Sequence, residues 1–182
     1  MSLLALCYPK LGADDQRFID GFRDHHDHAY RDVVRAHFTM VFQVRDLAEP
    51  VFTEHVALIA GRSAPIRFVC RYAMVHNDVS SDDYYVFLVP DEGFSELSLL
   101  HDALYTDVLA PKLRLDFPYV PHIGIATLKD PHRCKELADE LNGRGLRVDG
   151  SIEEISVVEY NGKNVTDLQH FRLGNALRIP IA

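Results

Sequence analysis

A stretch near the start of the chain, Arg35–Val44, alternates between apolar and other residues in the way that a β-strand does. The even-numbered residues from Phe38 to Val44 form an apolar face. The odd-numbered residues project from the opposite face: His37, Thr39, Val41 and Gln43. A buried strand has no structural need for a proton carrier beside a hydroxyl on one face. The pattern therefore predicts that His37 and Thr39 belong to a functional site.

A second stretch, Val120–Leu128, repeats this pattern in the other half of the chain. One face is predicted to carry His122, Gly124, Ala126 and Leu128, and the other Ile123, Ile125 and Thr127. The two histidines are separated by 85 positions in a chain of 182 residues. Two similar strands at half-chain spacing favour an internal duplication.

The elements that follow each histidine strand come in the same order: helix, strand, strand. Helices are predicted at 14–30, 50–60, 94–109 and 131–143, and further strands at 3–8, 66–75, 84–89, 151–160 and 166–173. The repeats span about 35–90 and about 120–174, and each forms a sheet unit too small to be stable alone. We therefore expect a single bilobal α+β domain over 1–182. It should have two mostly antiparallel sheets, helices on their outer faces and a cleft between the lobes, with 3–30 completing one lobe.

The segments His37–Met40 and His122–Ile125 resemble the paired His-x-(Thr or Ser)-x motifs of the 2H phosphoesterase superfamily. That superfamily includes bacterial 2′-5′ RNA ligase-like proteins and cyclic nucleotide phosphodiesterases. The resemblance implies that His37 and His122 are catalytic and that Thr39 and the position of Gly124 bind phosphate. It also implies substrates with a 2′,3′-cyclic phosphate or a 2′-5′ linkage, in a small nucleotide or at an RNA end.

Two histidines suit such a reaction. Cleaving a phosphodiester requires one proton to be taken from the attacking oxygen and another to be given to the leaving oxygen. Because the unperturbed pKa of His is about 6.5, a neutral imidazole can act as base and a charged one as acid, without a metal or cofactor. The Thr39 hydroxyl and a backbone amide near Gly124 could stabilise the developing charge. The sequence leaves open which histidine is the acid.

Two positions depart from the family pattern. Gly124 stands where Thr or Ser is usual, and Thr127 stands where ligase-like members often carry Arg. Gly124 indicates either a second motif that has lost its role or a site with room for a bulky group, since glycine permits close approach to the backbone. A module that binds a nucleotide or phosphate without turnover is therefore the alternative function. Arg71 or Lys129 could supply the positive charge, although exposed lysines and arginines more often serve only as surface residues.

Other candidates lie outside the two motifs. Tyr72 and Tyr119 could flank a base or sugar of the substrate, although aromatic residues in strands more often pack against neighbours. His25 and His28 lie one helical turn apart and could share a metal ion. No further Cys, Glu or His follows them at ligand spacing. We therefore expect no metal, and a metal-dependent hydrolase is a third hypothesis.

The composition limits the partners. A net charge of −8 disfavours extended duplex nucleic acid held by phosphate contacts and favours a small nucleotide. Cys7, Cys70 and Cys134 are scattered, which fits a reducing compartment. No apolar run approaches membrane-spanning length. We therefore expect a cytoplasmic protein without membrane contact, and the oligomeric state stays open.

Overall fold

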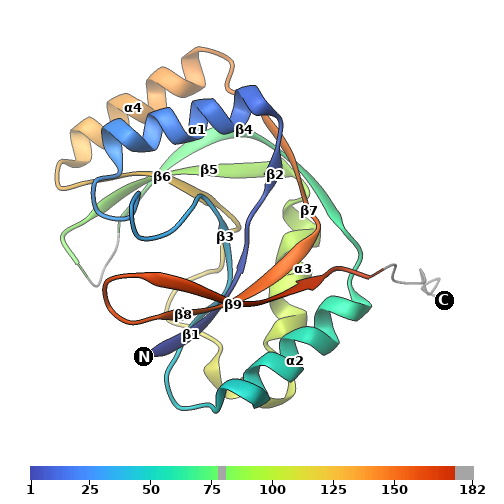
Figure 1. Cartoon of the computed structure of the whole chain (residues 1–182). Helices are drawn as coiled ribbons and strands as arrows, with labels where there is room; N and C mark the ends of the chain where they lie inside the picture. The colour runs from blue at the N-terminus through green and yellow to red at the C-terminus, as the bar shows by residue number, and fades with distance from the viewer. Residues whose placement is uncertain (78–80, 175–182) are drawn as a thin grey trace.

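The computed structural model describes residues 1–77 and 81–174 of the chain (Figure 1). Its helices are α1 (Ala13–His26), α2 (Glu49–Arg62), α3 (Phe94–Leu104), the 3₁₀ helix η1 (Asp107–Lys112) and α4 (Pro131–Gly143). Its strands are β1 (Ser2–Cys7), β2 (Lys10–Leu11), β3 (Phe38–Val44), β4 (Ile66–Asn77), β5 (Tyr84–Glu92), β6 (Ile123–Leu128), β7 (Val148–Ile152), β8 (Glu154–Tyr160) and β9 (Val165–Arg172).

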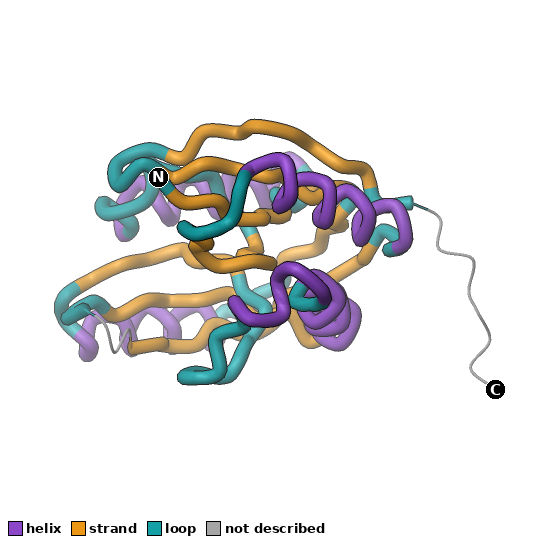
Figure 2. Tube along the Cα trace, turned by 90° about the horizontal axis from the view of Figure 1, so that it is seen from below, coloured by secondary structure: helices purple, strands orange, loops and turns teal. Residues whose placement is uncertain are grey.

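The strands form two antiparallel sheets, which lie as separate layers in Figure 2. Sheet A has the strand order β3-β1-β8-β9, and sheet B has the order β2-β7-β4-β5-β6. Helices flank both sheets, so the predicted α+β class with two antiparallel sheets is confirmed. The strand that follows each histidine, β3 or β6, is the edge strand of its sheet.

The two halves of the chain exchange strands between the sheets. β1 lies between β3 and β8, and β5 lies in the same way between β6 and β4. Sheet A therefore combines the His37 strand with strands that follow the His122 strand. The expectation that each half forms its own sheet unit is wrong, because α2 leads the chain from sheet A into sheet B. The N-terminal segment also serves both sheets, since β1 is in sheet A and α1 contacts β6 of sheet B.

The predicted strand 151–160 is two strands in different sheets. β7 pairs with β4 in sheet B, and β8 pairs with β1 in sheet A. Only Glu153 separates them. In β7 only Val148 and Ile152 are buried, whereas in β8 four consecutive residues, Ile155–Val158, are buried. β8 is therefore covered on both faces in the middle of sheet A, unlike β7 in sheet B.

One continuous core joins the sheets and their helices. α4 packs on β4, β5 and β6, whereas α2 packs on β1, β8 and β9, at the opposite end of the molecule in Figure 1. Phe38 of sheet A and Phe68 of sheet B meet edge to face, with 5.0 Å between their ring centroids. The apolar face of β3 therefore helps to hold the two sheets together. Across residues 1–77 and 81–174, no helix has the length and apolar character needed to cross a membrane.

Two helices end earlier than predicted. α1 ends at His26 instead of 30, and Asp27 is its C-cap residue, whose backbone amide donates to the Arg23 carbonyl. α3 ends at Leu104, and only residues 107–109 of the predicted remainder lie in a helical segment, η1. Thr106 is extended and Asp107 has a φ of 45°, so the backbone leaves the α-helical conformation before η1 begins.

Candidate active site

A β-bulge follows each histidine motif at the same position. The extra, unpaired residue is Met40 in β3 and Ile125 in β6. A one-residue shift turns every later side chain to the opposite face of the strand. The predicted faces are therefore wrong directly after the motifs, although a second register shift in β3 leaves Val44 on the apolar face where it was predicted. Val41 lies on the apolar face of β3, and Thr127 lies on the same face as Gly124.

Within the motifs, burial agrees with the predicted faces. The four residues predicted for the site are all partly exposed: His37, Thr39, His122 and Gly124. Their apolar neighbours are fully buried: Phe38, Met40, Ile123 and Ile125. The motif faces are thus the ones that a ligand could reach.

The two histidines make the same backbone contact. Nδ1 of His37 lies 2.7 Å from the carbonyl oxygen of Arg35, and Nδ1 of His122 lies 2.6 Å from that of Val120. A carbonyl oxygen can only accept a hydrogen bond, so Nδ1 carries the proton in both rings. Nε2 is therefore the nitrogen that can take up or release a proton. It makes no hydrogen bond to the described residues in either ring.

Burial lowers the pKa of both imidazoles to about 4, although the hydrogen bond to the carbonyl opposes this shift. The charge of Arg23 lowers the pKa of His37 further. Positive charge on His37 and on His76 lowers the pKa of His122. His37 and His122 therefore lie close enough for the charge of one to act on the other.

The second motif has an aromatic neighbour in place of a hydroxyl. The Phe87 ring stacks on His122 with 3.7 Å between centroids and 16° between planes, and Phe87 pairs with Gly124 across the sheet. A Cβ at Gly124 would meet the Phe87 ring at 3.9 Å, an ordinary van der Waals distance. The φ angle at Gly124 is not positive. Neither space nor backbone conformation therefore requires glycine at this position.

The first motif has polar neighbours. The Thr39 hydroxyl makes no hydrogen bond to the described residues, so it can donate to a ligand. Tyr119 donates from its hydroxyl to the Thr39 carbonyl at 3.1 Å, and its ring stacks on His101 at 3.6 Å. Tyr119 thus contacts the site through the Thr39 backbone. Tyr72 lies on the Phe87 face of sheet B and is 57% exposed.

A buried ion pair, which sequence reasoning missed, links the two motifs. Arg23 and Asp27 lie 2.8 Å apart, and their side chains are only 5% and 4% exposed. Arg23 also donates to the carbonyl of Val34, at 2.9 Å, close to His37 in the chain. Thr127, which follows the second motif, donates to Asp27 at 2.9 Å. The Arg23–Asp27–Thr127 cluster therefore ties α1 to both motifs. The i,i+4 spacing of Arg23 and Asp27 could have suggested the pair, but not its burial.

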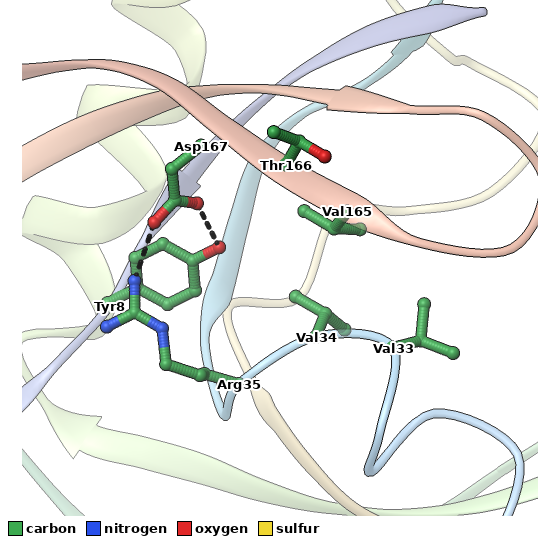
Figure 3. Close-up of a pocket in the computed structure, with 7 residues that line it drawn as sticks. All are labelled: Tyr8, Val33, Val34, Arg35, Val165, Thr166 and Asp167. Atoms are coloured by element: carbon green, nitrogen blue, oxygen red, sulfur yellow. Dashed lines mark hydrogen bonds and ion pairs between the residues drawn. The ribbon is translucent and has the colours of Figure 1, made fainter.

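A pocket of about 330 Å³ opens beside the first motif (Figure 3), and we call it the side pocket. It is lined by Tyr8, Val33, Val34, Arg35, Val165, Thr166 and Asp167. Asp167 accepts a hydrogen bond from the Tyr8 hydroxyl at 3.0 Å and one from Arg35 at 2.8 Å. The guanidinium carbon of Arg35 lies 3.8 Å from the centroid of the Tyr8 ring. Three distant segments supply these residues, so no local motif indicated the pocket.

The other charged candidates have local partners. His25 Nδ1 lies 2.7 Å from the Gly21 carbonyl oxygen. Arg71 pairs with Asp91, and Lys129 pairs with Asp83. Within residues 1–77 and 81–174, no group of three His, Cys, Asp or Glu side chains is placed to hold a metal ion.

Comparisons with known proteins agree with this architecture. The E. coli protein LigT in its apo form is 18% identical, with a TM-score of 0.54 over 95% of this chain and 97% of LigT. TT0787 of Thermus thermophilus is also 18% identical, with a TM-score of 0.61 over 96% of this chain and 100% of TT0787. At these identities the likeness shows the fold alone, and no curated protein matches the chain. The sequence model of the 2′-5′ RNA ligase superfamily matches residues 11–164, which include both histidine motifs. The chain therefore belongs to this superfamily, the 2H phosphoesterases that its motifs resemble.

Proposed function

We propose that the protein is a metal-independent phosphodiesterase that acts on 2′,3′-cyclic phosphates or 2′-5′ linkages by general acid–base catalysis, in which one of His37 and His122 is the base and the other is the acid. The observation that carries the proposal is the matched geometry of the two imidazoles. Each is held through Nδ1 by a carbonyl two residues earlier, and each keeps Nε2 for proton transfer. Membership of the 2′-5′ RNA ligase superfamily supports phosphodiesterase-type chemistry in general.

The reaction needs one histidine in each protonation state. The neutral ring takes a proton from water as the water oxygen bonds to phosphorus. The charged ring gives its Nε2 proton to the ribose oxygen as the phosphorus–oxygen bond to that oxygen breaks. A monoester is the product. In both states Nδ1 keeps its proton and its carbonyl partner, so the rings do not have to turn during the cycle.

Phosphate binding is assigned to the two motif faces. The Thr39 hydroxyl donates to a non-bridging oxygen, and a backbone amide near Gly124 takes the place of a second hydroxyl. Tyr72, which is exposed, flanks the site from sheet B, whereas Tyr119 contributes through the Thr39 backbone. No metal or cofactor is needed for these steps.

A small nucleotide or an RNA end is the proposed substrate. Among the similar solved structures, LigT is complexed with 3′-AMP in one and with ATP in another. The net charge of −8 gives no support for binding a long polyanion. We place the protein in the cytoplasm, because Cys7, Cys70 and Cys134 are all buried free thiols, which fits a reducing compartment.

The test is a panel of 2′,3′-cyclic nucleotides and 2′-5′-linked dinucleotides, assayed with and without EDTA. Turnover should persist in EDTA and be lost in His37→Ala and His122→Ala. Activity that disappears in EDTA and returns with zinc or manganese would instead support the metal-dependent hydrolase.

A nucleotide- or phosphate-binding module without turnover is the second candidate. Two observations favour it: Gly124 lacks a hydroxyl, and burial lowers the pKa of both histidines, so that neither is charged at neutral pH in the free protein. Binding of 3′-AMP without hydrolysis of any member of the panel would support this candidate over the enzyme.

A further inference from the structure

We propose that the side pocket binds the nucleobase next to the scissile phosphate, and that it holds the base by stacking without reading its edge. The inference rests on the proposed function, because it places one nucleoside of the substrate beside His37. It adds a base subsite and a specificity: a substrate must carry a base, but any of the four will serve.

The side pocket is joined directly to the first histidine. Arg35, one of its lining residues, supplies the carbonyl that holds Nδ1 of His37. The Tyr8 ring meets the His37 ring edge-on, with 6.3 Å between centroids. A nucleoside in the pocket would therefore present its ribose phosphate toward the imidazole.

The two walls of the pocket suit a flat ring. One wall is apolar and consists of Val33, Val34 and Val165, which Figure 3 places on the side away from the ion pair. The other wall holds the Arg35 guanidinium, which lies against Tyr8 and whose side chain is 66% exposed. Bases stack well on guanidinium planes and aromatic rings. A volume of about 330 Å³ lies within the usual range for small-ligand pockets.

The carboxylate of the pocket already has partners within it. Both oxygens of Asp167 accept hydrogen bonds, one from Tyr8 and one from Arg35. The backbone amide of Val165 donates to the Val33 carbonyl at 3.3 Å, which joins the segments that carry the apolar wall. The pocket is thus preformed, and the Asp167 carboxylate is not available to distinguish the edges of different bases.

The first test compares substrates. The four 2′,3′-cyclic nucleotides should have kcat/KM values within a few-fold of one another, because every base offers a stacking face. A methyl riboside 2′,3′-cyclic phosphate, which has no base, should be poorer by about tenfold to a hundredfold, mostly through KM. Arg35→Gln removes the guanidinium and keeps the backbone carbonyl, so it should reduce this difference. Arg45→Gln, at an exposed position after β3, is the matched control.

The second test fills the pocket. Thr166→Trp places an indole at the rim, and it should raise KM for the nucleotides while leaving the base-free substrate unaffected. The chain contains no tryptophan, so this variant has a single tryptophan, which can be excited apart from the tyrosines and whose emission should change on titration with 3′-AMP. Leu99→Trp, at a residue of α3 that is 67% exposed, should show neither effect.

The outcomes separate the two proposals. If no cyclic or 2′-5′-linked substrate is turned over, the proposed function fails, while the fluorescence titration still tests the pocket. If turnover occurs but the base-free substrate is hydrolysed as well as the nucleotides, the base subsite is wrong. An equal effect of Thr166→Trp on both kinds of substrate would also overturn it.

Discussion

The two histidine motifs share a backbone frame but differ in their surroundings. Both adjoin edge strands, both are followed by a bulge, and both imidazoles are held by a carbonyl two residues earlier. Around this frame, His37 has Thr39 and the edge of Tyr8, whereas His122 has Gly124 and the face of Phe87. The shared backbone geometry therefore leaves Nε2 of each histidine free for proton transfer. The neighbouring side chains determine which substrate groups can be bound beside each histidine.

The largest effect should come from removing either histidine. If the two frames form one site, His37→Ala and His122→Ala should each lower kcat by about 10²–10⁴-fold, the usual size of general acid–base contributions. The double variant should lose little more than the worse single variant, because acid and base act in one step. Initial rates on a cyclic nucleotide measure this.

His132→Ala, at an exposed position of α4, is the control and should keep full activity. If the fold-losses in kcat of the two single variants multiplied in the double variant, His37 and His122 would act independently. Full activity of His37→Ala would refute the two-histidine mechanism.

The next largest effect should be a loss of stability when the Arg23–Asp27–Thr127 cluster, which contacts both motifs, is disrupted. Arg23→Met leaves Asp27 as a buried, unpaired charge and should cost about 3–5 kcal/mol of unfolding free energy. Thr127→Val removes one donor to the same carboxylate and should cost about 1–3 kcal/mol. Urea unfolding of each variant gives these values.

Arg17→Met on the same helix is the matched control, because the Arg17–Asp14 pair is 71% and 93% exposed and should contribute less than about 1 kcal/mol. If the cluster also positions the motifs, Thr127→Val should lower kcat more than it changes KM. An Arg23→Met variant as stable as Arg17→Met would show that the buried pair does not hold the motifs together.

A smaller effect should come from exchanging the phosphate-binding positions. Thr39→Ala should lower kcat by about tenfold to a hundredfold, because Thr39 supplies one donor from a partly exposed position. Gly124→Ser should fold normally, since a Cβ there meets only the Phe87 ring, at 3.9 Å.

A gain of several-fold in kcat on a small cyclic nucleotide would indicate that the second motif lacks a useful hydroxyl. A loss would indicate that the space beside Phe87 is used by the substrate. Circular dichroism of each variant excludes an unfolding artefact.

The motifs and most elements could be predicted from the sequence, because alternation and capping are local. The Asp130 side chain, for example, accepts from the His132 amide and begins α4 where expected. The bulges could not be predicted. Each bulge adds a single residue. Because Met40 and Val41 are both apolar, the alternation of apolar and polar residues does not show that the strand changes face there. The strand exchange was hidden for a similar reason, since β7 and β8 are separated only by Glu153.

The candidate site also contains residues that could be predicted from the sequence and residues that could not. His37, Thr39, His122 and Gly124 follow from a repeated local pattern. Arg35 and Asp167, by contrast, lie 132 positions apart and meet only because β9 joins sheet A. Contacts of this kind depend on tertiary structure, and neither their spacing nor their composition indicates them.

The smallest effect should distinguish the pKa of His37 from the pKa of His122. Burial lowers both pKa values to about 4, so both rings are neutral in the free protein at pH 7. Because one ring must be charged and the other neutral, kcat/KM should rise as the pH falls from 7 toward about 4 and fall again at lower pH. The pH optimum of kcat should be higher, since a bound phosphodiester anion favours the charged form of a nearby imidazole.

The substitution His76→Gln should change the pKa of His122 and leave that of His37 unchanged. Positive charge on His76 lowers the pKa of His122, whereas the charge beside His37 comes from Arg23. The substitution should therefore raise the pKa of His122 and move one limb of the kcat/KM profile upward by less than about one pH unit. His132→Gln, at an exposed position of α4, should leave both limbs in place. If His76→Gln moved both limbs equally, the two histidines would titrate as one coupled pair, and no separate role could be given to either frame.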